Sequence, residues 1–169
     1  MTGRHVVSIE TLMLRAGSDN RWSYRRVVAS PDPGQSPDEA ARLACGIAAD
    51  EPSTVVHSTS WRHRPGEIVL TYAVCPDPEP WRAATELTDL EPARGAAPAT
   101  PAPERIEVAH VAAHAIRHLA FLMAEDPVVR AALRRHPEVA GALEATGANG
   151  RDGDRATAWA APPSGRSAR

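Results

Sequence analysis

The chain has 169 residues, of which 43% are hydrophobic and only 4% aromatic, so the core of one domain has to rest on Val, Leu, Ile and Ala. The formal net charge is −2, which excludes a general nucleic-acid binder. All 19 basic residues are arginine, and Ala and Pro are frequent. We interpret this composition as a bacterial coding bias, so that a single arginine carries little functional weight.

Neither a signal for export nor a membrane segment is predicted. The apolar run near the N-terminus is broken at Glu10, and no stretch approaches the roughly 18 apolar residues of a membrane helix. Cys45 and Cys75 lie far apart and form neither a CxxC pair nor a zinc pattern. We therefore expect a cytoplasmic protein with two buried thiols and with no membrane or nucleic-acid partner.

A β-hairpin followed by a short helix is predicted in the first third of the chain. Residues 5–14 and 21–29 alternate as strands do, and a run of turn-forming residues separates them. The helix begins with a capping box formed by Ser36 and Glu39, and we expect it to run to about Asp50. Its apolar stripe is expected at Ala40, Leu43, Ala44 and Ile47.

A second hairpin is predicted at residues 54–75, with Pro65-Gly66 as its turn. Regular alternation from that turn places Trp61 opposite Leu70 and the residue two positions earlier, Thr59, opposite Tyr72. One face is then the expected core face, and the other is small and polar, suited to solvent or to the floor of a cleft. The expected core face carries His57, Thr59, Trp61, Ile68, Leu70, Tyr72 and Val74, and the polar face carries Val56, Ser58, Ser60, Arg62, Val69, Thr71, Ala73 and Cys75.

The second half of the chain is predicted to be a linker followed by helices. A short helix is expected at 81–87, a longer one at 104–123, and a further one after the cap at Asp126. The fold class is therefore α+β, with two β-hairpins in a mixed or antiparallel sheet around one short helix, followed by C-terminal helices. The expected parts are the α+β core at 1–80, a Pro/Ala-rich linker at 81–103, helices packing on the core at 104–146, and a disordered tail at 147–169.

Three histidines recur at four-residue spacing on the predicted 104–123 helix. His110, His114 and His118 lie nearly opposite its apolar face, with Phe121 among them. Histidines at i and i+4 can share a metal ion, so His110–His114, or else His114–His118, is a candidate divalent-metal site of a hydrolase-like enzyme. The other interpretations are a solvated face, packing against the sheet, or a homodimer interface through this helix. The apolar face is expected at Val108, Ala112, Ile116, Leu119 and Met123.

A loose basic group surrounds the two hairpins. Guanidinium groups suit phosphate and carboxylate, so Arg26 and Arg62, with Ser58 and Ser60, are the candidate ligand-binding residues. The sequence contains no phosphate loop and no GxSxG nucleophile motif. We therefore expect a non-catalytic domain without a cofactor, which binds a small anionic molecule or a protein partner.

The order of hairpin, glycine-containing loop, helix and second hairpin resembles a Nudix domain over residues 5–75. In that family the glutamates of an REUxEE helix bind the magnesium that activates a diphosphate substrate. Arg42 stands in the place of the family's arginine, but the glutamate positions fall on Leu43, Gly46 and Ile47. The resemblance therefore implies a domain that has lost Nudix hydrolysis, with a degenerate Nudix-type hydrolase as the alternative.

Overall fold

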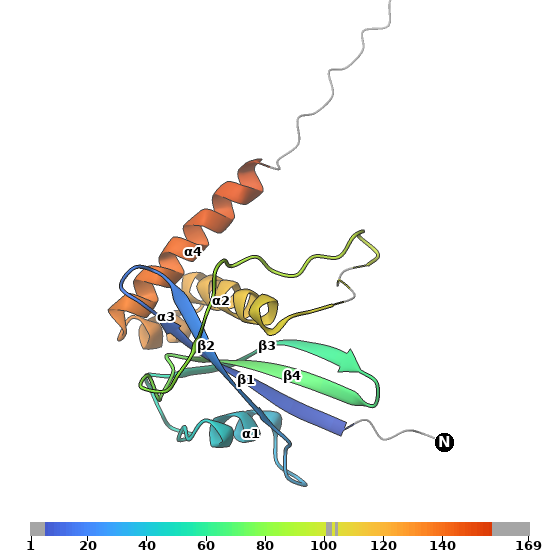
Figure 1. Cartoon of the computed structure of the whole chain (residues 1–169). Coiled ribbons are helices and arrows are strands. Elements are labelled where there is room, and N and C mark those ends of the chain that lie inside the picture. The colour runs from blue at the N-terminus through green and yellow to red at the C-terminus, as the bar shows by residue number, and fades with distance from the viewer. Residues whose placement is uncertain (1–5, 101–102, 104, 157–169) are drawn as a thin grey trace, which may run out of the picture.

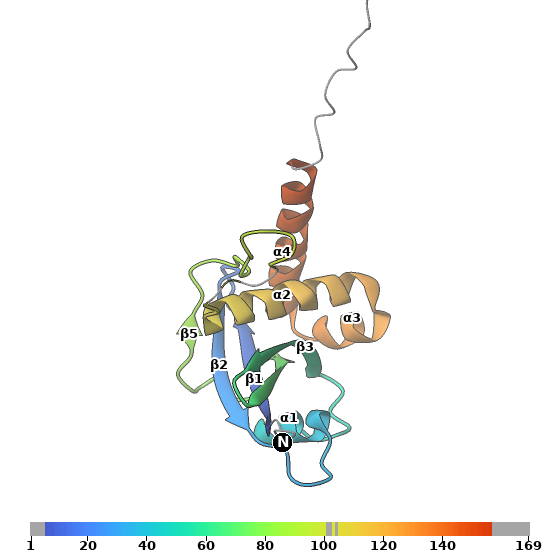
Figure 2. The same cartoon turned by 90° about the vertical axis from the view of Figure 1, so that its right-hand side faces the viewer.

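The computed structural model describes residues 6–100, 103 and 105–156, with 149–156 described as backbone only. Within this part of the chain, a five-stranded mixed sheet carries α1 on one face and α2, α3 and α4 on the other (Figures 1 and 2). This arrangement confirms the predicted α+β class. The strands are β1 (Val6–Ala16), β2 (Trp22–Ala29), β3 (Val55–Arg64), β4 (Glu67–Cys75) and β5 (Thr85–Glu86), and the helices are α1 (Pro37–Ala44), α2 (Val108–Glu125), α3 (Pro127–Leu133) and α4 (Pro137–Ala156).

The sheet has the strand order β3-β4-β1-β2-β5. Both predicted hairpins are present as antiparallel pairs, β1 with β2 and β3 with β4, and the two hairpins meet where β1 lies parallel to β4. The prediction of a short helix at 81–87 is wrong. The chain there forms β5, which pairs with β2, and the amide of Leu87 donates to the carbonyl of Trp22 at 2.9 Å.

Helix α1 begins as predicted and ends earlier than predicted. Its capping box is present, but the helix stops at Ala44 instead of near Asp50. Gly46 adopts a φ of +67°. Its amide donates to the carbonyl of Leu43 at 3.1 Å, and the amide of Ile47 donates to the carbonyl of Arg42 at 2.9 Å. These two bonds form a Schellman motif, which ends the helix.

The apolar stripe of α1 was predicted correctly at Ala40 and wrongly at Leu43. Ala40 and Ala41 are buried against Ile9 and Tyr72, whereas Leu43 is 69% exposed. Residues two positions apart on a helix point to opposite sides, so burial of Ala41 turns Leu43 to solvent.

A β-bulge at Thr59 changes the faces of β3. Ser58 pairs with Tyr72, while Ser60 already pairs with Thr71, so Thr59 is an extra residue in the strand. The predicted partner of Tyr72 is therefore wrong, although Trp61 does lie opposite Leu70.

The bulge also corrects the two predicted faces. Directly opposed residues of an antiparallel pair share a face, so His57, opposite Ala73, points toward α2 together with Ser60 and Arg62. Ser58 points to the other face of the sheet, as does Trp61, which is 68% exposed and not part of the core.

The main core lies between the sheet and the C-terminal helices. The predicted apolar face of α2 is confirmed, except that Val108 is only partly buried, and Cys45 and Cys75 are both buried. The core includes Leu12, Leu14, Trp22, Ala112, Ile116, Leu119, Met123, Leu133 and Leu143.

The C-terminal helices continue further than predicted. Asp126 caps α3 as expected, accepting from the amides of Val128 at 2.8 Å and Val129 at 3.2 Å. Helix α4 runs to Ala156, so the disorder expected for 147–156 is wrong, and residues 157–169 of the expected tail lie outside the described residues. None of the helices in the described part of the chain is long and apolar enough to cross a membrane.

Candidate functional site

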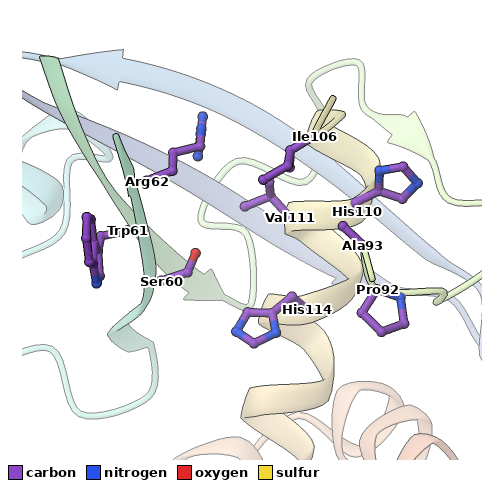
Figure 3. Close-up of a pocket in the computed structure, with 9 residues that line it drawn as sticks. All are labelled: Ser60, Trp61, Arg62, Pro92, Ala93, Ile106, His110, Val111 and His114. Carbon is purple, nitrogen blue, oxygen red and sulfur yellow. The ribbon is translucent and has the colours of Figure 1, made fainter. Parts of the chain in front are cut away.

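A cavity of about 280 Å³ lies between β3 and the N-terminal half of α2 (Figure 3). Ser60 and Arg62, opposite Thr71 and Val69 of β4, point toward α2 and form the β3 side of this space. The ring of Trp61 points away from it (Figure 3). We call this space the β3–α2 cavity. Its lining residues are Ser60, Trp61 and Arg62 from β3, Pro92 and Ala93 from the linker, Ile106 just before α2, and His110, Val111 and His114 from α2.

Beside the cavity, two arginines share one buried carboxylate. Glu10 of β1 is fully buried, and its two oxygens accept from Nη1 and Nη2 of Arg62 at 2.7 Å and 2.8 Å. Nε of Arg26 donates to the same carboxylate at 2.7 Å, and the hydroxyl of Thr71 donates at 3.1 Å. These four residues form the Glu10 cluster, which joins β1, β2, β3 and β4 on the face covered by α2.

The Glu10 carboxyl is ionised despite its burial. Burial by itself raises the pKa of Glu10, but the hydrogen bonds and charges of Arg62 and Arg26 outweigh burial and hold this pKa below its ordinary value. Two guanidinium groups then face one negative charge, so the cluster keeps a net positive charge. Among the described residues Arg26 is bonded only through Nε, which leaves its terminal nitrogens able to donate.

The structure brings together three of the four predicted ligand-binding residues. Arg62 and Ser60 line the cavity, and Arg26 is linked to Arg62 through Glu10, although Arg26 does not itself line the cavity. Ser58 is exposed on the other face of the sheet because of the bulge. Glu10 was missed as a site residue, and its signal was an acidic residue within an otherwise apolar strand.

His110 and His114 both line the cavity, but their rings do not converge. Nδ1 of His110 accepts from the amide of Glu107 at 3.4 Å, and Nε2 of His114 lies 3.2 Å from the carbonyl of Thr59. Figure 3 shows the two rings directed to different sides of α2. Among the described residues no group of three His, Cys, Asp or Glu side chains is placed to hold a metal ion.

A second histidine arrangement links α2 to β3. The rings of His57 and His118 stack with centroids 5.3 Å apart and planes 7° apart, and the ring of His114 lies 6.3 Å from that of His118. We call these three residues the histidine stack. Regular alternation along β3 does not predict this histidine stack, because alternation that ignores the bulge places His57 on the face of Trp61. Phe121, on the same side of α2, is 60% exposed.

These features define a small α+β domain with a partly apolar cavity beside a net cationic cluster. Comparison of the chain with protein-family models, with curated proteins and with solved structures finds no match. The resemblance to a Nudix domain therefore stays a prediction. The family's glutamate positions, at Leu43, Gly46 and Ile47, lie in and just after α1, on the opposite face of the sheet from the cavity.

Proposed function

We propose that the protein is a non-catalytic domain that binds a small anionic molecule in the β3–α2 cavity. The observation that carries the proposal is Arg62, whose side chain is only 14% exposed, lines the cavity and belongs to a cluster with more positive than negative charge. A guanidinium group partly shielded from water attracts an anion more strongly than an exposed one does, because the effective dielectric constant is lower there. Its fork geometry also suits carboxylate and phosphate groups.

The remaining lining indicates what accompanies the acidic group of the ligand. Pro92, Ala93, Ile106 and Val111 give the cavity an apolar side, and Ser60 adds a hydroxyl that donates or accepts. Ligand pockets usually combine an apolar surface with a few polar groups that fix orientation, and this cavity lies near the small end of their size range. These features favour a small organic carboxylate or phosphate ester with an apolar body.

The test is a binding screen on the full chain at pH 8. Aliphatic and aromatic carboxylates and phosphate monoesters are compared by thermal shift, and each hit is measured by titration calorimetry. Replacement of Arg62 by glutamine removes a charge-assisted contact, which contributes about 1.5–3 kcal/mol. We therefore expect Arg62→Gln to weaken binding roughly ten- to hundredfold.

Arg64→Gln is the matched control, since Arg64 lies on the same strand, is 49% exposed and does not line the cavity. Its affinity should equal that of the wild type. Saturable binding that is unchanged in Arg62→Gln would contradict the proposed site. Turnover of a diphosphate ester with divalent metal, abolished in Asp50→Asn or Glu51→Gln, would contradict the non-catalytic assignment and favour the Nudix-type alternative.

A further inference from the structure

The histidine stack joins the edge strand of the sheet to the helix that covers it. His57 comes from β3, and His114 and His118 come from α2. The ring of His118 contacts both of the others, at centroid distances of 5.3 Å from His57 and 6.3 Å from His114. Neutral imidazoles stack as flat, partly apolar rings. Protonated imidazoles at such distances repel each other, and partial burial strengthens this repulsion.

No acidic group among the described residues is paired with any of the three rings. On the neighbouring strands, Arg62 of β3 is bonded to Glu10 of β1, and β4 contributes to this face the buried thiol of Cys75, whose pKa is raised by burial to about 12. Of the other helices, α3 carries Arg130, which donates to backbone carbonyls. Glu138 and Glu144 of α4 and Glu125 of α2, like Arg117 of α2, are exposed to solvent. Positive charge on the stack is therefore not balanced by a nearby carboxylate.

We propose that the histidine stack is a pH-sensitive contact, which holds α2 against β3 while its rings are neutral and weakens when they gain protons. The proposal does not depend on the proposed ligand. Because His114 also lines the β3–α2 cavity, weakening of the stack would loosen one side of that cavity. This last consequence alone rests on the proposed function.

The direction of the pH dependence follows from His118. Burial, and then the charges of His57 and His114, lower its pKa from the ordinary value of 6.5. The unfolded chain therefore binds the proton first as the pH falls. The contribution of His118 to stability is fully present above about pH 6.5, and it is lost as the pH falls from 6.5 through the lower pKa of His118 in the folded state.

The first measurement is an NMR titration of histidine-labelled full chain from pH 8 to pH 5. We expect His118 to titrate below 6.5, and we expect the amides of β3 around Thr59 and of α2 around His114 to lose protection from exchange over the same range, while the amides of β1 keep it. Titration of His118 at or above 6.5 would overturn the proposal.

The second measurement uses variants. His118→Phe keeps an aromatic ring without a titrating group, so its unfolding equilibrium constant should rise several-fold less than that of the wild type between pH 8 and pH 5. His110→Gln, on the same helix outside the stack, should behave as the wild type does. If His118→Phe does not fold, His57→Phe is used instead. Equal pH dependence in the wild type and the stack variant would overturn the proposal, whereas failure of anion binding at pH 8 would affect only the proposed function.

Discussion

Arg62 of the edge strand β3 places both terminal nitrogens on the carboxylate of Glu10 in the central strand β1, at 2.7 Å and 2.8 Å. The two strands are not neighbours, since β4 lies between them. The pair therefore crosses the sheet on the face that α2 covers, and it fixes the guanidinium beside the cavity. The same contact stabilises the sheet and positions the candidate ligand-binding group.

Replacement of Glu10 by alanine should be strongly destabilising. It leaves the guanidinium groups of Arg26 and Arg62 facing each other without a buried counter-charge, and such a loss typically costs about 3–5 kcal/mol. Urea unfolding at pH 7 measures the change in the free energy of unfolding. The control is Asp19→Asn, because Asp19 pairs with Arg21 in an exposed contact of 3.4 Å and should contribute far less. Equal effects of the two substitutions would show that the Glu10 cluster does not stabilise the fold.

Acid should unfold the protein through two buried carboxylates. Burial raises the pKa of Glu10 and of Asp77, but their arginine partners outweigh burial and hold both pKa values below the ordinary 4.5 and 3.8. Asp77 is bonded to Arg15 at 2.6 Å and to Arg25 at 2.7 Å. The unfolded state therefore binds protons first, and stability is lost as the pH falls below about 4.5.

The measurement of this acid dependence is the free energy of unfolding from pH 6 to pH 3. In Asp77→Asn, stability at pH 6 should be lower and the remaining decline toward pH 3 shallower, because one of the two linked protons is gone. A decline as steep as that of the wild type would mean that Asp77 does not contribute to acid unfolding.

Two glycines should respond to alanine with opposite signs. Gly46 ends α1 at a φ of +67°, where a side chain is strained even though the space around it is open, so Gly46→Ala should destabilise by about 1–2 kcal/mol. Gly141 lies within α4, also with open space around it, so Gly141→Ala should stabilise by about 0.5–1 kcal/mol. Thermal unfolding of both variants checks the signs. A stabilised Gly46→Ala would contradict the Schellman end of α1.

Features that depend on a few neighbouring residues were predicted from the sequence. The capping box of Ser36 and Glu39 and the cap at Asp126 were found because each is a local hydrogen-bonding pattern. The hairpins and the apolar face of α2 followed from periodicity alone. Arg26, Ser60 and Arg62 were identified for their chemistry, and the structure places them around one carboxylate and one cavity.

Features that depend on distant parts of the chain were not predicted. The role of Glu10 needs arginines from two other strands, and β5 is a two-residue strand that pairs with the distant strand β2. Helix α4 continues across several glycines despite their low helix propensity. Its first half packs in the core through Ala142 and Leu143.

The bulge at Thr59 had the largest effect on the predicted site, and its removal gives the last prediction. Thr59 is the extra residue between Ser58 and Ser60, so its deletion should remove the bulge and keep the other pairs of β3 with β4. His57 would then stay opposite Ala73 on the α2 face, and Val55, which is 8% exposed, would stay opposite Cys75.

We expect this deletion to keep the stacked partner of His118 in place. His57→Ala is the variant that removes this ring, again without changing the register. In His57→Ala the pKa of His118 should move toward its ordinary value of 6.5, since His57 is one of the groups that lower it, whereas in the deletion variant this pKa should stay as in the wild type. An NMR titration of the histidine rings measures this change. A His118 pKa that is the same in His57→Ala as in the wild type would show that His57 is not in electrostatic contact with His118.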